Sequence, residues 1–277
     1  MSRPRISIIT PSYNQLQFIE KTLRSVQQQG YRNFEHLVID GASTDGSVQL
    51  LERLSALPGW GHLTFLSEPD DGQSAALNKG FRMATGDIVG WLNSDDLYRP
   101  DCFDTVVRAF EQFPEADVIY GDVTWIDEYG KCLRVRREID FSRFILAYHR
   151  VLYIPSTSTF FRRRVFDEGN FLDPQYHYAM DYDLFLRLAQ ANYCFRHIPL
   201  LLADFRMHAA SKSGSQTSKF QQEQNRIMWR RSPLLSRLPR GVPLLIGTYG
   251  MRTIAAGLRY STKLFRGCYF GQYRTSS

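Results

Sequence analysis

The first hundred residues alternate two kinds of short segment, and this alternation limits the fold more than any other feature of the sequence. Runs with the β-branched and apolar character of strands occupy residues 5–10, 35–40, 63–66 and 87–92. Between them, apolar side chains recur at helical spacing, and residues 18–26 are the first example. Repeated strand–helix units predict an α/β fold, with helices on the faces of a mostly parallel sheet.

The second half of the chain is less regular. Strand-like runs occupy residues 117–120, 123–126, 156–161 and 197–202, and a helical pattern begins at Asp181. The central sheet is therefore expected to be mixed, with its parallel part formed by the first half of the chain.

Composition disfavours several classes of protein. No apolar run among the 277 residues approaches the roughly 20 needed to cross a bilayer. A strand that begins near Ile6 is inconsistent with a secretory signal at the N-terminus. The four cysteines are scattered without C-x-x-C spacing, which argues against a zinc site or a disulfide framework. We therefore expect a cytoplasmic protein.

Polar side chains follow each of the four strands of the first half. Tyr13 follows the first strand, Asp40 ends the second, and the segments 70–73 and 93–96 follow the third and fourth. In a parallel sheet these residues would share one rim, where ligands of such sheets bind. A divalent cation, Mg²⁺ or Mn²⁺, would relieve the repulsion between the clustered carboxylates and could hold a phosphate-bearing ligand. Alternatively, individual carboxylates such as Asp40 cap the following helix.

Familiar nucleotide-binding motifs are missing from the sequence. No G-x-G-x-x-G follows a strand, and no G-x-x-x-x-G-K-[ST] is present, which argues against a dinucleotide dehydrogenase and a P-loop ATPase. H-E-x-x-H and G-x-S-x-G are also absent. A metal held by carboxylates is therefore the leading candidate for binding phosphates.

Four segments in this order resemble a family 2 glycosyltransferase with the GT-A fold. They are Ile8–Asn14, Val38–Ser47, Glu68–Gly80 and Trp91–Asp96. The resemblance continues through Asp181–Arg187 and Phe205–His208, so it covers residues 5 to about 210. It is greatest to bacterial enzymes that build cell-surface polysaccharides. It implies an α/β/α sandwich around a mostly parallel, mixed sheet.

The resemblance assigns a role to particular residues. Asp181 takes the place of the catalytic base, although Met180 stands where the family usually has Glu. Asp95 would bind the metal that bridges the donor's diphosphate, and His208 falls near a second metal-binding position. Asn93 replaces the first Asp of the family's Asp-x-Asp motif. The positions assigned to the nucleotide sugar are Pro11, Tyr13, Asp40, Asp71, Gly72, Gln73, Lys79, Asn93 and Ser94.

The activity that the resemblance implies is an inverting, metal-dependent transfer of a hexosyl or N-acetylhexosaminyl group. The donor would be a nucleoside diphosphate sugar, with uridine as the family's usual base, and the acceptor a polysaccharide or a lipid-linked oligosaccharide. A carboxylate is needed to take the proton from the attacking hydroxyl. The alternative is a non-catalytic homologue that binds nucleotide sugar or scaffolds other enzymes, as the changes at Asn93 and Met180 suggest. Nucleic acid is not an expected partner, because the body of the chain is neutral.

The chain divides into a glycosyltransferase domain, residues 1–210, and a basic extension, residues 211–277. Within the domain, residues 1–100 would bind the nucleotide sugar and residues 101–210 the acceptor. Residues 155–159 are expected on the acceptor side, and Arg162–Arg164 could meet a phosphate of a lipid-linked acceptor or could form a solvated turn.

The net charge of +6 arises from the extension, since residues 232–277 contain seven basic residues and no acidic one. If residues 244–266 form a helix, its basic residues share one side and its apolar residues the other. The basic set is Arg252, Arg259, Lys263 and Arg266. This pattern predicts a helix in an anionic membrane interface, on the inner face of the plasma membrane. Alternatively, the helix docks its apolar stripe onto its own domain.

Overall fold

The computed structural model describes residues 3–149, 151–209, 217–231 and 243–269. A single mixed sheet crosses the described part of the molecule, with its strands in the order β3-β2-β1-β4-β8-β6-β9-β5 and β7 paired to β6. The strands are β1 (Ile6–Ser12), β2 (Phe34–Asp40), β3 (Leu63–Ser67), β4 (Ile88–Trp91), β5 (Leu97–Tyr98), β6 (Val118–Ile126), β7 (Cys132–Arg136), β8 (Thr159–Arg162) and β9 (Phe195–Arg206). The predicted α/β fold is confirmed.

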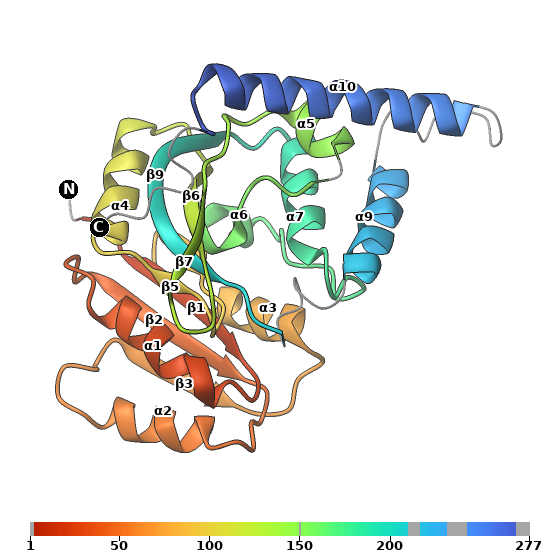
Figure 1. The fold of residues 1–277 in the computed structure, drawn as a ribbon. Helices are drawn as coiled ribbons and strands as arrows, with labels where there is room; N and C mark the ends of the chain where they lie inside the picture. The colour runs from red at the N-terminus through yellow and green to blue at the C-terminus, as the bar shows by residue number, and fades with distance from the viewer. Residues whose placement is uncertain (1–2, 150, 210–216, 232–242, 270–277) are drawn as a thin grey trace.

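Helices lie against both faces of this sheet (Figure 1). They are α1 (Leu16–Gln27), α2 (Ser47–Ser55), α3 (Gln73–Met83), α4 (Cys102–Gln112), α5 (Arg143–Tyr148), α6 (Arg164–Asp167), α7 (Met180–Gln190), α9 (Thr217–Arg231) and α10 (Pro243–Phe265). None of the described helices combines the length and the apolarity that crossing a bilayer requires. All four cysteines, each within the described residues, are free thiols.

The first half of the chain forms the parallel part of the sheet, as predicted. β1 pairs in parallel with β2 and with β4, and β2 pairs in parallel with β3. Every residue of β1 is buried, because helices cover both of its faces. On one face α3 approaches so closely that a Cβ at Gly80 would lie 2.4 Å from Ile9 Cγ2, so this helix position requires glycine. Because β1, β2 and β4 run parallel, their carboxyl ends meet at one rim of the sheet.

The second half departs from the expected strand boundaries. Residues 117–120 and 123–126 belong to one strand, β6, which continues through an irregularity at Gly121. A Cβ at Gly121 would lie 2.6 Å from Leu202 side-chain atoms, so the glycine here permits a close approach of β9 rather than marking a turn. β8 runs antiparallel to both β4 and β6 and thereby joins the two halves.

The basic extension packs on the part of the fold formed by residues 101–210. α10 crosses α5 at the top of the molecule in Figure 1, and its buried Arg259 and Lys263 reach the buried carboxylate of Glu138. Arg259 Nη2 lies 2.8 Å and Lys263 Nζ 3.1 Å from Glu138 oxygens, and Arg136 Nε adds a third contact at 2.7 Å. These three cations hold the pKa of Glu138 below its usual range although burial opposes them.

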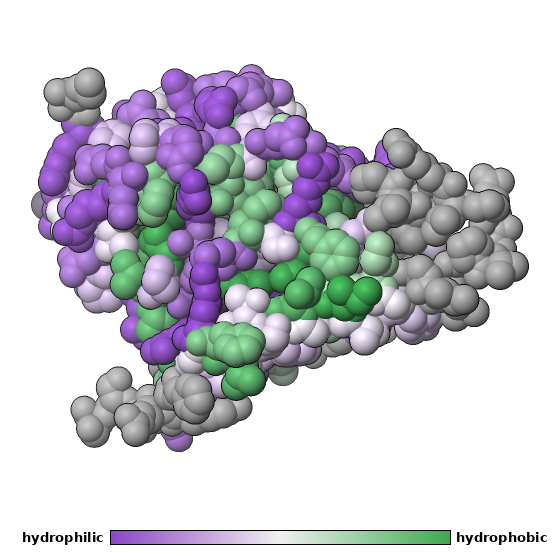
Figure 2. Space-filling model, turned by 90° about the horizontal axis from the view of Figure 1, so that it is seen from above, coloured by the Kyte–Doolittle hydropathy of each residue, from purple (hydrophilic) through white to green (hydrophobic). Residues whose placement is uncertain are grey.

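This packing reverses the orientation that we expected for the extension. The only charged residues between positions 253 and 265 are Arg259 and Lys263, and both are buried. Ile254, Leu258 and Phe265 are exposed instead, Phe265 to 89%. Figure 2, which looks down on α10, shows apolar side chains on this face. The prediction of an outward basic face is therefore wrong for these residues, because a buried glutamate attracts them inward.

Two of the three arginines at 162–164 contact acceptors within the fold, and Arg163 lies 3.9 Å from Asp167 at the surface. Arg162 donates to the main-chain carbonyls of Phe110, Pro114 and Ala116. Arg164 Nε donates to Asp117 Oδ1 at 2.7 Å. The guanidinium groups of Arg162 and Arg164 thus already have acceptors in the protein.

Candidate active site

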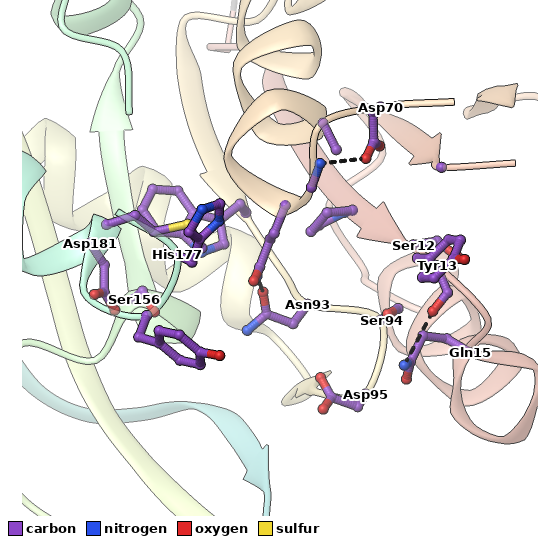
Figure 3. Close-up of a pocket in the computed structure, with 18 of the residues that line it drawn as sticks. Ser12, Tyr13, Gln15, Asp70, Asn93, Ser94, Asp95, Ser156, His177 and Asp181 are labelled. Carbon is purple, nitrogen blue, oxygen red and sulfur yellow. Dashed lines mark hydrogen bonds between the residues drawn. The ribbon is translucent and has the colours of Figure 1, made fainter. Parts of the chain in front are cut away.

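A pocket of about 720 Å³ opens at the rim where β1 and β4 end. Figure 3 shows Tyr13 and Asp181 at its opposite ends, with Asn93, Ser94 and Asp95 between them. Of the positions predicted from the sequence, those that line the pocket are Pro11, Tyr13, Gly72, Gln73, Asn93, Ser94, Asp95, Asp181 and His208. Asp40, Asp71 and Lys79 are not among the lining residues.

Tyr13 provides an open aromatic surface at one end of the pocket. Its side chain is 64% exposed, and Gly41 lies beside it. A Cβ at Gly41 would be 3.3 Å from Tyr13 Cδ2 and 3.1 Å from Asp70 Oδ2. The missing side chain therefore leaves a space between Tyr13 and Asp70 into which a flat ring can enter and stack.

Three predicted residues lie outside the pocket for different reasons. Asp40 is fully buried, and its carboxylate accepts hydrogen bonds from Ser43 and Ser67, so it fixes the turn beneath the pocket. Lys79 forms an ion pair with Glu68. Asp71 is exposed to solvent, and its neighbour Asp70 lines the pocket instead while accepting the Gly72 N–H at 2.8 Å.

The turn after β4 is held by Asp96, a residue that the sequence did not single out. Its buried carboxylate accepts from the backbone of Arg206, from Thr157 Oγ1 and from Asn93 Nδ2, at 2.8, 2.8 and 3.1 Å. Burial and the adjacent charge of Asp95 raise the pKa of Asp96 well above its usual range.

The same network explains why asparagine stands at position 93. Asn93 donates through Nδ2 to Asp96, and its Oδ1 accepts from Gln73 Nε2 at 2.8 Å. An amide satisfies both partners, because it carries a donor and an acceptor. An aspartate here would place a second carboxylate against Asp96, so Asn93 is a matched part of the network.

Asp95 and His208 come together at the middle of the pocket. Asp95 Oδ2 lies 2.9 Å from His208 Nε2, and Arg206 Nε donates to the Asp95 main-chain carbonyl at 2.7 Å. The His208 ring also packs against Phe18, with ring centroids 4.6 Å apart. Within the described ranges, no group of three or more His, Cys, Asp or Glu side chains is arranged to hold a metal. Two protein ligands of this kind suit a divalent ion whose other positions are filled by phosphate oxygens and water.

Asp181 lies at the far end of the pocket, in the first turn of α7. It is half-buried, and burial raises its pKa from 3.8 to about 6 even though its hydrogen bonds with Tyr182 N and Ser156 oppose this. Asp183, two residues on, is fully buried and paired with Arg187 and Arg231 at 2.8 and 2.5 Å. Of the two carboxylates only Asp181 lines the pocket, because residues two apart on a helix point in different directions.

The backbone that carries Asp181 is fixed by Glu223 of α9. Its carboxylate accepts the N–H groups of His177, Tyr178 and Ala179, at 3.0, 2.8 and 2.8 Å. These donors belong to the N-cap residue Ala179 and to the two residues before it, so Glu223 fixes the backbone that leads into α7. Glu223 belongs to the extension, outside the region of resemblance, so no motif pointed to it.

Comparison with known proteins agrees with this geometry. Residues 7–169 match the family model described as glycosyl transferase family 2. An uncharacterised glycosyltransferase of Mycobacterium tuberculosis is 34% identical over 191 residues, which is 68% of this chain and 70% of that protein. TuaG of Bacillus subtilis, a glycosyltransferase named for teichuronic acid biosynthesis, is 36% identical over 99 residues, which is 36% of this chain and 39% of TuaG.

Two solved structures share the fold. S. aureus TarS in complex with UDP-GlcNAc superposes with a TM-score of 0.63 at 16% identity, covering 91% of this chain and 80% of that one. The mannosyltransferase PcManGT from Pyrobaculum calidifontis, in complex with GDP-Man and Mn²⁺, gives a TM-score of 0.62 at 21% identity, covering 92% and 70%. The family model spans more than half of the chain, and the described fold is that of GT-A transferases. The chain belongs to glycosyl transferase family 2.

Proposed function

We propose that this chain transfers a sugar, with inversion, from a nucleoside diphosphate sugar to a hydroxyl of a glycan or lipid-linked glycan. The observation that carries the proposal is the position of Asp181. Its carboxyl, with a pKa of about 6, lies in one pocket with the Asp95–His208 pair and at the opposite end from Tyr13. The pocket thus has separate places for a nucleotide base at Tyr13, a diphosphate at Asp95 and His208, and a proton-accepting carboxylate at Asp181.

In this mechanism Tyr13 stacks on the nucleotide base, and Asn93 and Ser94 contact the ribose or diphosphate from the turn after β4. Asp181 accepts the proton of the attacking hydroxyl. A raised pKa makes it a stronger base than an ordinary aspartate, while leaving it ionised at neutral pH. Glu223 keeps the start of α7, and with it Asp181, in place.

We assign Asp95 and His208 to a divalent metal, with Mn²⁺ or Mg²⁺ as candidates. When bound, such an ion neutralises charge on the departing nucleoside diphosphate. The Mn²⁺ bound together with GDP-Man in the PcManGT complex supports this choice. The UDP-GlcNAc bound by TarS supports a uridine donor carrying a hexosyl or N-acetylhexosaminyl group.

Our proposal for the acceptor is supported by the exposed face of α10 and by the name of one similar protein. The name of TuaG supports a role in cell-surface polysaccharide synthesis. The outer residues of α10, namely Ile254, Leu258 and Phe265, are exposed and uncharged. We assign this face to contact with a lipid bilayer, in which an interfacial helix buries its apolar side. Contact would then be driven by apolar burial, with less dependence on anionic lipids than a basic face would give.

The proposal is tested by titrating nucleoside diphosphates with and without Mn²⁺, followed by turnover assays with the matching nucleotide sugar. We expect one nucleotide to bind tightly only with metal, and Asp181→Asn to bind it normally while losing turnover. Asp167→Asn, a surface carboxylate of α6, serves as the matched control. Normal donor turnover by Asp181→Asn would exclude Asp181 as the base, whereas nucleotide binding by a wild type without turnover would identify a non-catalytic homologue.

A further inference from the structure

A second pocket of about 620 Å³ adjoins the first and shares Ser156, Tyr178, Asp181 and Phe205 with it. It therefore opens onto the proposed catalytic base from the side opposite Tyr13. Residues 155–157, which were expected on the acceptor side, line this pocket, and of them only Ser156 also lines the first pocket. β7, α9 and α10 supply much of the rest of its wall, together with residues of β6 and of the segment 151–154.

The charges on this wall are strongly unbalanced. Its described lining contains five cationic side chains, Arg134, Arg136, Arg252, Arg259 and Lys263, and one carboxylate, Asp181 at the junction. Behind the wall, the single carboxylate of Glu138 contacts Arg136, Arg259 and Lys263 together. Neither Arg134 nor Arg252 has an ion-pair partner among the described side chains. The described wall thus carries an excess of positive charge.

Hydrogen-bond donors without acceptors line the same wall. Gln224 is 3% exposed and Arg259 6%, yet Gln224 Nε2 and Arg259 Nε, like the buried Nε of Arg134, have no hydrogen-bond partner among the described residues. Leaving a buried donor unpaired costs about 1–3 kcal/mol. All three atoms are donors of side chains that line the pocket, so hydrogen-bond acceptors, which an oxyanion supplies, are what this wall lacks.

Neighbouring groups respond to the same positive potential. Burial and the nearby Arg259 and Arg252 lower the pKa of His149 to about 4. Burial and Arg259 likewise lower the pKa of Lys263, although Glu138 acts against them. Sites with this excess of positive charge bind phosphate through charge-assisted hydrogen bonds, and arginine binds it through two parallel N–H groups.

We infer that the second pocket binds a phosphate group of the acceptor, so that the acceptor substrate is a phosphorylated glycan or a phosphate-linked lipid. This inference rests on the proposed function, because it places the acceptor hydroxyl at Asp181 and the phosphate against Arg134, Arg252 and Gln224. The role that the sequence offered to Arg162–Arg164 thus passes to residues of β7 and α10.

The test is calorimetric titration of inorganic phosphate and glycerol 3-phosphate into protein already saturated with its nucleoside diphosphate, with glucuronate as the carboxylate comparison. We expect the double variant Arg134→Gln/Arg252→Gln, and separately Gln224→Met, to weaken binding of both phosphates, the double variant by about tenfold or more. None of these three side chains contacts Glu138, so the buried ion pairs are kept. The exposed Arg137, which does not line the pocket, gives the matched control Arg137→Gln.

Unchanged phosphate affinity in the double variant, or no phosphate binding by wild type, overturns the inference, and so does a preference for glucuronate. Titration with polyprenyl phosphate in detergent micelles distinguishes a phosphate-linked lipid from a phosphorylated glycan as the acceptor. Tighter binding than glycerol 3-phosphate identifies a lipid-linked acceptor, and equal binding a soluble phosphorylated glycan. Failure of the proposed function gives a different result from failure of this inference. If the wild type binds phosphate in this pocket but binds no nucleotide, the phosphate site is supported and the transferase mechanism is excluded.

Discussion

His208 Nε2 lies 2.9 Å from Asp95 Oδ2, although the two residues are 113 positions apart in the chain. The turn after β4 supplies one and the segment after β9 the other. The contact joins the nucleotide half of the domain to the end of the acceptor half, beside the place that we assign to the diphosphate. A bound cation would replace the hydrogen bond with two metal–ligand bonds.

We predict that His208→Ala lowers nucleotide affinity only when metal is present, by about 10–100-fold. Without metal, affinity should be that of the wild type, because the imidazole then has no role in holding the phosphates. Calorimetry with and without Mn²⁺ checks this, with His62→Ala as a control outside the pocket. An equal loss in both conditions would mean that His208 contacts the nucleotide directly.

Restoring the family's aspartate at position 93 should damage this chain. Asn93→Asp puts a carboxylate where an amide now donates to Asp96 at 3.1 Å, and we expect a loss of about 1–3 kcal/mol in the free energy of unfolding at pH 7. The loss should shrink at low pH as one of the two carboxyls takes a proton. Denaturant unfolding at pH 5 and 7 measures it. Tighter Mn²⁺ binding with unchanged stability would show that the amide network is dispensable.

Turnover should depend on pH through Asp181. Since burial raises its pKa to about 6, the rate should fall tenfold per pH unit below pH 6 and level off above it. Asp181→Asn should reduce the rate by about 10²–10⁴-fold and abolish the fall in rate below pH 6. A rate profile that stays flat down to pH 5 would contradict a base with this pKa.

The same substitution should stabilise the protein above pH 6. Folding raises the pKa of Asp181, so the folded protein bears the cost of an ionised, half-buried carboxylate fully above about pH 6 and not at all below about pH 4. Asp181→Asn should therefore gain about 1–3 kcal/mol at pH 8 and nothing at pH 4. Thermal unfolding at both pH values tests this. Asp183→Asn should instead lower the free energy of unfolding, because it leaves Arg187 and Arg231 beside a neutral group.

The outer face of α10 gives a separate prediction about membranes. Replacing Ile254, Leu258 and Phe265 with serine should abolish sedimentation of the protein with vesicles. The loss of binding should be as large for neutral vesicles as for anionic ones. Arg137→Gln should sediment as the wild type does. If the triple variant instead changes the oligomeric state and leaves vesicle binding intact, the face is an interface between copies of the chain.

The strand–helix alternation of residues 5–92 predicted the parallel sheet, and the polar residues after its strands predicted the rim. These features are local, since β-branched runs and turn residues act within a few positions. Asp40 was misplaced because a side chain at a strand end can point into the pocket or beneath it, and only the Ser43 and Ser67 hydroxyls decide. The contact of Glu223 with Ala179 spans 44 residues and that of Glu138 with Arg259 spans 121, and no spacing rule reaches so far.

α9 and α10 furnish the support of Asp181 and much of the wall of the second pocket, whereas Tyr13, Asn93 and Asp95 come from the first hundred residues. In the proposed reaction, donor and acceptor would therefore be recognised by separable stretches of sequence. Exchange of residues 217–269 with those of a relative would thus be a route to a new acceptor with an old donor. Such a chimaera must retain the two cations of α10 that contact Glu138, since an incoming helix without them would leave this buried carboxylate with Arg136 alone.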